Sequence, residues 1–339
     1  MLSSTSSSRL PEGRWGRTLV LAAVLTLAAG AAIETVLRAQ GFRPGFPESP
    51  GLWSYHRARA VGTEPVVLLG FSRMQLGVDP AVLEEEFGRP VLQLAVNATS
   101  PMPILADLAA DERFAGTVWI SVLEGDLFEH QGEASAYVRH FRENPSNLNR
   151  ELNRDAARFL TANLAMRSSQ ARLLAWWESW LRGLPNDAPY VVMRADRYRA
   201  ADYQAHADLP GLRDYIRGAW DDFLDPWAEW AERPDAPQIF ADSVAMLRQR
   251  VEAIEERGGE VVLIRLPVSG PLRDREYRLF PREDYWEYLV GETGATAVHF
   301  EDYEEFAGLS LPDDSHLDAR DAPAFTRSLA RIVQEHSRR

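Results

Sequence analysis

The sequence contains no cysteine and no lysine in its 339 residues, and each absence excludes a class of chemistry. Without cysteine the chain can form no disulfide, bind no metal through a thiolate and use no thiol nucleophile. Without lysine it can form no Schiff base and has no phosphate-binding lysine. The 37 basic residues are therefore all arginine, and with 50 acidic residues the net charge is −13. So acidic a chain lacks the basic face that nucleic acids require, and we expect no nucleic-acid partner.

What the sequence does contain is enough apolar material for a folded core. Hydrophobic residues make up 45% and charged residues 26%, a balance typical of globular proteins and not of disordered chains. The length exceeds the roughly 100 to 200 residues of a typical domain. We therefore expect one enlarged domain, or one domain that carries a sizeable insertion.

An apolar run near the amino terminus is the clearest topological signal. Residues 18–37 lie between Arg17 and Arg38 and span 20 residues, enough at ~1.5 Å each to cross the ~30 Å hydrocarbon core of a bilayer. Residues 1–17 would then be a cytoplasmic leader, and the body would lie on the extracytoplasmic side of the inner membrane as a single-pass protein. The small residues 29–31 leave a second interpretation open, a cleaved signal peptide and a secreted body.

After a linker with several prolines at 38–62, short apolar runs alternate with helical segments. Continuous runs rich in β-branched residues are typical of parallel strands that are buried on both faces. Five such strands are expected, at 66–70, 91–96, 117–123, 260–266 and 295–300. Helices are expected at 80–87, 101–112 and 320–335. This alternation predicts an α/β fold with a three-layer, flavodoxin-like parallel sheet.

Residues 128–240 interrupt the alternation with little strand signal. A crossover between parallel strands needs only about a dozen residues, so this segment is an insertion, expected to be helical, between two parts of the α/β domain at 63–127 and 241–339. Six tryptophans fall in the insertion: Trp176, Trp177, Trp180, Trp220, Trp227 and Trp230. They fill an auxiliary core, or they belong to a lid or a platform for sugar rings.

Catalytic side chains are expected where parallel strands end, because ligands collect at that edge of an open sheet. Ser72 follows the first strand in the sequence Gly70-Phe71-Ser72, on a tight turn that can expose its hydroxyl. Asp313 and His316 lie between the fifth strand and the closing helix, at a spacing that lets the carboxylate reach the imidazole. A serine nucleophile requires such a base, and the base requires a carboxylate. The alternative for Ser72 is a residue that caps a turn.

In these motifs and in its strand–helix alternation, the sequence resembles the SGNH (GDSL-type) hydrolase superfamily, in particular its membrane-anchored bacterial members. The resemblance covers about residues 65–335 without the insertion. It implies that Ser72 is the nucleophile, His316 the base and Asp313 the assisting carboxylate. Asp314 is the fallback for the last role.

The resemblance also implies an oxyanion hole after the second and third strands, where this sequence departs from the family. In place of the family's glycine stand Asn97 and Ala98, whose backbone N–H groups, or the Asn97 amide, could donate. In place of its asparagine stands Asp126, whose ionised carboxylate would repel an oxyanion. Arg73 and Arg265 could offset that charge or bind an anionic substrate. Alternatively, each forms a salt bridge within an acid-rich protein.

These features together predict a membrane-tethered periplasmic serine esterase or O-acyltransferase. Its substrate would be an acylated glycan of the cell envelope or an exported polysaccharide, foremost an acetyl ester, or else a small ester. We expect no metal, because the other six histidines show no ligand spacing. We also expect no cofactor. The alternative is a catalytically degenerate SGNH-like protein of envelope assembly or binding, whose insertion contacts a protein partner.

Overall fold

The computed structural model describes residues 15–128, 135–144, 159–168, 171, 177, 190–205 and 209–337. Its central sheet has five strands, all parallel, in the order β2-β1-β3-β6-β7. The strands are β1 (Val66–Leu69), β2 (Val91–Gln93), β3 (Thr117–Ser121), β6 (Glu260–Arg265) and β7 (Thr296–His299). The predicted α/β fold and its five parallel strands are therefore confirmed, and the strand order is compatible with a flavodoxin-like sheet.

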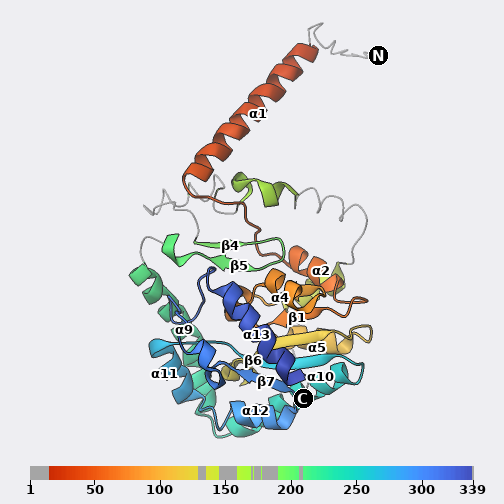
Figure 1. Cartoon of the computed structure of the whole chain (residues 1–339), viewed down its shortest axis with the longest axis vertical. Coiled ribbons are helices and arrows are strands. Elements are labelled where there is room, and N and C mark those ends of the chain that lie inside the picture. The colour runs from red at the N-terminus through yellow and green to blue at the C-terminus, as the bar shows by residue number, and fades with distance from the viewer. Residues whose placement is uncertain are drawn as a thin grey trace, which may run out of the picture.

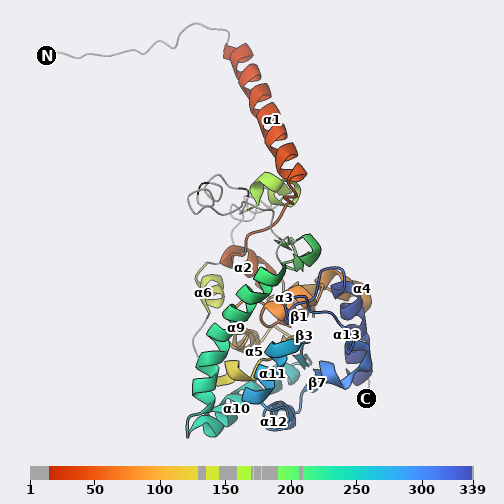
Figure 2. The same cartoon turned by 90° about the vertical axis from the view of Figure 1, so that its left-hand side faces the viewer.

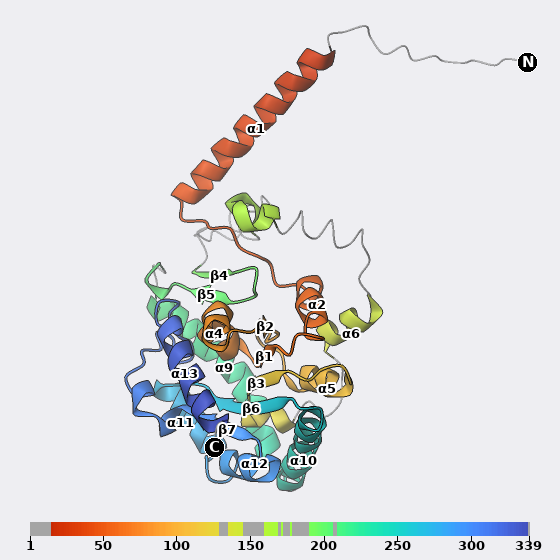
Figure 3. The ribbon, with the colours of Figure 1, turned by 45° about the vertical axis from the view of Figure 1, so that its right-hand side comes forward.

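Helices cover both faces of this sheet (Figures 1 and 3). One face carries α3 (Ser72–Gly77), α4 (Pro80–Phe87) and α13 (Ala322–Ser337), and the other carries α5 (Met102–Ala110), α10 (Ala236–Glu255) and α12 (Trp286–Thr293). Successive side chains of a strand point to opposite faces, so Leu68 packs with the apolar side chains of α4 and α13, and Leu69 packs with those of α5, α10 and α12. The sheet is thereby buried on both sides, which explains its uninterrupted apolar strands.

The first helix, α1 (Trp15–Ala39), projects away from the body (Figure 1). It is long and apolar enough to cross a membrane, and its most apolar stretch buries no residue against the protein. At its base the Glu34 carboxylate accepts the backbone N–H groups of Ala165 and Met166 at 2.8 and 3.0 Å. Residues 165 and 166 of the insertion therefore contact α1 near its carboxyl-terminal end. The orientation in a membrane and the cleavage of the leader stay predictions.

Part of the predicted linker at 38–62 is in fact folded. Helix α2 (Pro50–Ala58) begins after Ser49, whose hydroxyl caps its first turn, and has proline at its first position, where the missing N–H has no cost. Trp53 is fully buried, and its indole N–H donates to the Leu94 carbonyl at 3.0 Å. The proline that suggested a linker is thus a helix-start signal, and the linker prediction is wrong for this stretch.

The insertion at 128–240 also differs from its prediction in two ways. It contains a two-stranded antiparallel sheet, β4 (Val191–Met193) with β5 (Arg199–Ala201), whose strands are too short to give a sequence pattern. This pair lies between the base of α1 and the rest of the body (Figures 1 and 3). The predicted end at 240 falls inside α10, which begins at Ala236 and is the crossover helix that leads to β6.

Helix α9 (Leu209–Ala231) carries three of the tryptophans and runs past α3 towards α11 (Gly270–Leu279) (Figure 2). Trp220 and Trp227 are only 8% and 3% exposed and belong to the same apolar cluster as the sheet. They extend the main core, so they form neither an auxiliary core nor an exposed platform. Of the other insertion tryptophans, Trp230 packs against this cluster, Trp177 is exposed, and Trp176 and Trp180 lie outside the described residues.

The fold predicts that α2 belongs to the cooperative body. Arg57 is 1% exposed, and its Nε donates to Asp107 of α5 at 2.8 Å. We expect Arg57→Ala to lower the free energy of unfolding by about 2 to 4 kcal/mol, because the buried Asp107 carboxylate loses its buried partner. Asp107 then keeps only its ion pair with Arg142. The exposed neighbour provides the control, since Arg59→Ala should cost less than about 0.5 kcal/mol. Urea unfolding of the full chain in detergent measures both, and equal, small effects would contradict the prediction.

Candidate active site

Ser72 is the first residue of α3 and is separated from the end of β1 by a turn of two residues, Gly70 and Phe71. The conformation of this turn requires glycine at position 70. Gly70 has φ 147°, a conformation that residues with a side chain rarely adopt. A Cβ atom at this position would also approach the side chains of Met74 and Ser121 to 2.9 Å. The chain therefore turns sharply at the end of the strand and presents the Ser72 hydroxyl at the carboxyl edge of the sheet.

Asp313 and His316 lie on the loop between β7 and α13. The loop turns where the Asp314 N–H donates to the Leu311 carbonyl at 3.1 Å, with Asp314 itself in the left-handed region at φ 68°. Oδ1 of Asp313 accepts the backbone N–H groups of Ser315 and His316 at 3.0 and 2.7 Å. The carboxylate is thereby fixed against its own loop, with its second oxygen directed towards the imidazole.

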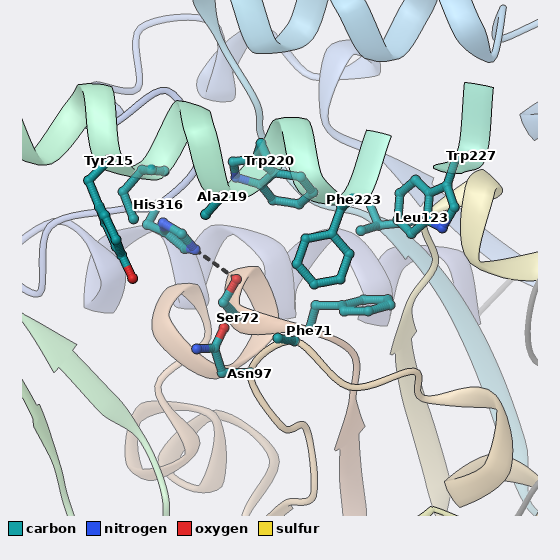
Figure 4. A pocket seen from close by; sticks show the side chains of 12 residues that line it. Phe71, Ser72, Asn97, Leu123, Tyr215, Ala219, Trp220, Phe223, Trp227 and His316 are labelled. Carbon is teal, nitrogen blue, oxygen red and sulfur yellow. Dashed lines mark hydrogen bonds between the residues drawn. The ribbon is translucent and has the colours of Figure 1, made fainter. Parts of the chain in front are cut away.

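The ring of His316 joins Ser72 to Asp313. Its Nδ1 lies 2.8 Å from Asp313 Oδ2, and its Nε2 lies 2.8 Å from Ser72 Oγ, the contact drawn in Figure 4. An acceptor-only carboxylate assigns the ring proton to Nδ1, so that the Ser72 hydroxyl donates to Nε2. The structure thus brings the three predicted residues into one hydrogen-bonded chain. The fallback Asp314 does not join it, because its carboxylate pairs with Arg217 at 3.0 Å.

A fourth group, which no sequence motif indicates, holds Asp313. Tyr203, directly after the β4–β5 pair, donates its hydroxyl to Asp313 Oδ2. Burial opposes ionisation of Asp313, but the charge of His316 and hydrogen bonds from His316, Tyr203 and the Ser315 N–H lower its pKa to about 2. Burial and the neighbouring carboxylate raise the pKa of Tyr203 above its usual range. Asp313 is therefore an anion, and Tyr203 a neutral donor, at neutral pH.

A pocket of about 250 Å³ opens beside Ser72 and His316 (Figure 4). Its polar groups are few, and most of its wall is apolar. Helix α9 supplies half of the lining residues, and the turns after β1, β2 and β3 supply most of the others. The lining residues are Phe71, Ser72, Asn97, Ala98, Leu123, Tyr215, Ile216, Ala219, Trp220, Phe223, Trp227 and His316.

Candidate donors for an oxyanion come from two turns. Asn97 and Ala98 line the pocket, as predicted, and the Asn97 side chain lies next to Ser72 in Figure 4. The backbone N–H of Asn97 is engaged elsewhere, because it donates to Gln75 Oε1 at 3.2 Å. The Asn97 amide and the Ala98 N–H remain candidates. The N–H of Ser72 joins them, since the first N–H groups of a helix have no partner within it.

Asp126 does not line the pocket. Its side chain is buried, and Oδ2 accepts the hydroxyl of Ser100 at 2.6 Å. The preceding Gly125 lies directly under Trp227, whose indole a Cβ atom would approach to 2.2 Å. The structure therefore directs this carboxylate towards Ser100, contrary to the expectation that it faces the oxyanion.

Arg73 and Arg265 form a buried ion-pair cluster instead of facing the pocket. Both guanidinium groups pair with Glu276 of α11, at 2.5 and 2.6 Å, and Arg265 also lies 3.4 Å from Glu124. Burial by itself would raise the pKa of Glu276, but the two guanidinium groups outweigh this effect and hold the pKa below its usual range. Arg73 additionally donates to Ser315 Oγ at 3.1 Å. The salt-bridge alternative therefore describes both arginines. Arg73 also links the turn that carries Ser72 to the loop that carries His316, the histidine loop.

Candidate metal ligands do not gather in the ranges that the structure describes. Within those ranges no three histidine, aspartate or glutamate side chains are placed so as to hold a metal ion. The expectation that neither a metal nor a cofactor takes part stays a prediction.

Comparison with known proteins gives only a distant likeness. No protein-family model and no curated protein matches this chain. Thirteen chains of solved structures are similar to it, among them the crystal structure of TesA. That likeness covers 80% of this chain and 98% of TesA, at 12% sequence identity and a TM-score of 0.34. Similarity at this level supports no statement about function, so the chemistry has to be inferred from the site itself.

The lowered pKa of Asp313 predicts how stability depends on pH. The Asp313 carboxyl binds its proton more weakly in the native state than in the unfolded chain, where its pKa is near 3.9. The ionised carboxylate therefore stabilises the fold fully above about pH 5, and this contribution is lost as the pH falls towards 2. The difference in free energy of unfolding between the protein and Asp313→Asn should shrink by about 1 kcal/mol from pH 6 to pH 3. Urea unfolding followed by tryptophan fluorescence measures it, and a constant difference would contradict the prediction.

Proposed function

We propose that this protein is a serine ester hydrolase or acyltransferase of the SGNH type. The observation that carries the proposal is the hydrogen-bonded chain from Ser72 Oγ through His316 to Asp313, which begins at the wall of a pocket. A nucleophile, its base and an orienting carboxylate in this order are the arrangement that activates a serine hydroxyl. The strand order of the sheet, and the position of both motifs at its carboxyl edge, support the same family.

The reaction follows from the roles of these groups. Ser72 Oγ attacks the acyl carbonyl while His316 Nε2 accepts the hydroxyl proton, and Asp313 stabilises the resulting imidazolium. Collapse of the tetrahedral intermediate breaks the bond to the leaving alcohol, which takes that proton from His316. Water then attacks the acyl-serine ester and gives hydrolysis, or a sugar hydroxyl attacks it and gives acyl transfer. His316 accepts the proton of the attacking group and returns it to Ser72 Oγ as the acyl-serine bond breaks. Tyr203 acts as a positioning residue, because its hydroxyl donates to Asp313 and its side chain does not line the pocket.

The negative charge of the tetrahedral intermediate requires donors at the pocket wall. The Asn97 amide, the Ala98 N–H and the Ser72 N–H are close at hand, and one such donor contributes about 10² to 10³ in rate. The burial of Asp126 against Ser100 keeps its carboxylate off this wall. The geometry therefore favours a working enzyme over the catalytically degenerate binding protein.

The location of the substrate follows from α1. With its apolar helix in the inner membrane, the body acts on the extracytoplasmic side, where acylated glycans of the cell envelope or exported polysaccharides are the ester-bearing polymers. The docking of residues 159–168 on Glu34 supports a body held close to the membrane surface. A small ester is the simplest surrogate for such a substrate.

The proposal predicts that ester hydrolysis depends on Ser72 and His316 as one unit. We expect Ser72→Ala and His316→Ala each to lower kcat/KM for p-nitrophenyl butyrate by about 10³ to 10⁴, and the double variant to lower it no further. Ser54→Ala, on α2 and outside the pocket, is the matched serine control and should leave the rate unchanged. Turnover that survives in Ser72→Ala would contradict the proposal, and a protein without any turnover would favour the non-catalytic alternative.

A further inference from the structure

One side of the pocket is a continuous apolar wall that starts at Ser72. Figure 4 shows the rings of Phe71, Phe223 and Trp227 following one another to the same side of Ser72, with Leu123 next to Trp227 at the far end. Such a wall offers alkyl groups dispersion contacts and offers a sugar almost no hydrogen-bond partners. The part of a substrate that extends in this direction is therefore apolar.

The size of the pocket exceeds what a small acyl group fills. Its volume is about 250 Å³, which exceeds the roughly 150 Å³ of an apolar cavity that binds the six-carbon ring of benzene. An acetyl group supplies only two carbon atoms. A short acyl group would leave water against apolar rings, and replacing that water with further methylenes is favourable.

Ion pairs fix the apolar wall in place. Arg217 of α9 pairs with Asp314 of the histidine loop at 3.0 Å, and Arg275 of α11 pairs with both Asp221 and Asp225 of α9. Helix α9 is thus tied to the same loop that carries the base and to α11 behind it. Trp227 is in addition only 3% exposed and packs directly against Gly125, so the far end of the wall is part of the core and its dimensions can select among acyl groups.

We infer that this pocket binds an apolar acyl chain of about six to eight carbon atoms, with its carbonyl at Ser72 and its alkyl end between Phe223 and Trp227. The inference rests on the proposed function, because it takes Ser72 as the residue that receives the acyl group. It replaces the acetyl ester expected from the sequence with a medium-chain ester. The glycan or other alcohol then occupies the open side of the pocket, near Tyr215.

A chain-length series tests the inference. The full-length protein in detergent is assayed with p-nitrophenyl acetate, butyrate, hexanoate, octanoate and dodecanoate at concentrations that remain in solution. We expect kcat/KM to rise roughly threefold to fourfold per methylene up to hexanoate or octanoate, in proportion to the apolar area buried, and to fall at dodecanoate. A maximum at acetate would overturn the inference.

Variants of α9 localise the preference. Phe223→Ala removes one ring of the wall, so the ratio of kcat/KM for hexanoate to that for acetate should fall about tenfold. A cooperative urea unfolding transition shows that the variant is folded. Asp222→Ala, at the exposed neighbouring position on the same helix, is the matched control and should leave both rates within about twofold. Equal losses for both esters in Phe223→Ala would overturn the role of the wall.

A binding measurement separates this inference from the proposed function. Isothermal titration calorimetry with the Ser72→Ala variant compares methyl octanoate with methyl acetate, neither of which the variant can consume by the proposed route. Binding of the octanoate alone supports the acyl pocket, even if the wild-type chain turns over no ester and the proposed function fails. Binding of neither ester overturns the acyl pocket, even if Ser72-dependent hydrolysis is found.

Discussion

The single imidazole of His316 connects the two ends of the α/β domain, and the site depends on this connection. One ring nitrogen meets an alcohol that follows the first strand, and the other meets a carboxylate that lies before the last helix. The parallel sheet brings both to its carboxyl edge, because all five strands run in the same direction. The buried, fully hydrogen-bonded Asp313 holds the ring in the orientation in which it can accept a proton from Ser72.

Two further parts of the chain stabilise this arrangement from opposite sides. The insertion contributes Tyr203, which donates to Asp313, and α9, which lines the pocket beside Ser72. From the other side, Arg73, which follows Ser72, pairs with Glu276 and donates to Ser315 of the histidine loop. Buried ions need such complete pairing, since an unpaired charge would cost several kcal/mol. The insertion is therefore part of the site and not an appendage to the sheet.

The sequence predicted the strands and the three residues of the hydrogen-bonded chain, because buried parallel strands and motifs at strand ends are local signals. Tyr203 and the pairing of Arg73 with Glu276 join residues more than a hundred positions apart, and no spacing in the sequence indicates them. The apolar stripe of α9 at Ile216, Trp220, Phe223 and Trp227 does have helical spacing. The tryptophans in it predict an auxiliary core, a lid or a sugar platform, because the same side chains serve each purpose.

Covalent labelling with a fluorophosphonate, followed by mass spectrometry of the proteolytic peptides, tests the central claim most directly. The probe reacts with a serine only when a base removes its proton. The account predicts a single adduct on the peptide that contains Ser72, and a loss of labelling in His316→Ala. An adduct on a different serine, or none on a protein whose unfolding transition is intact, would contradict the account.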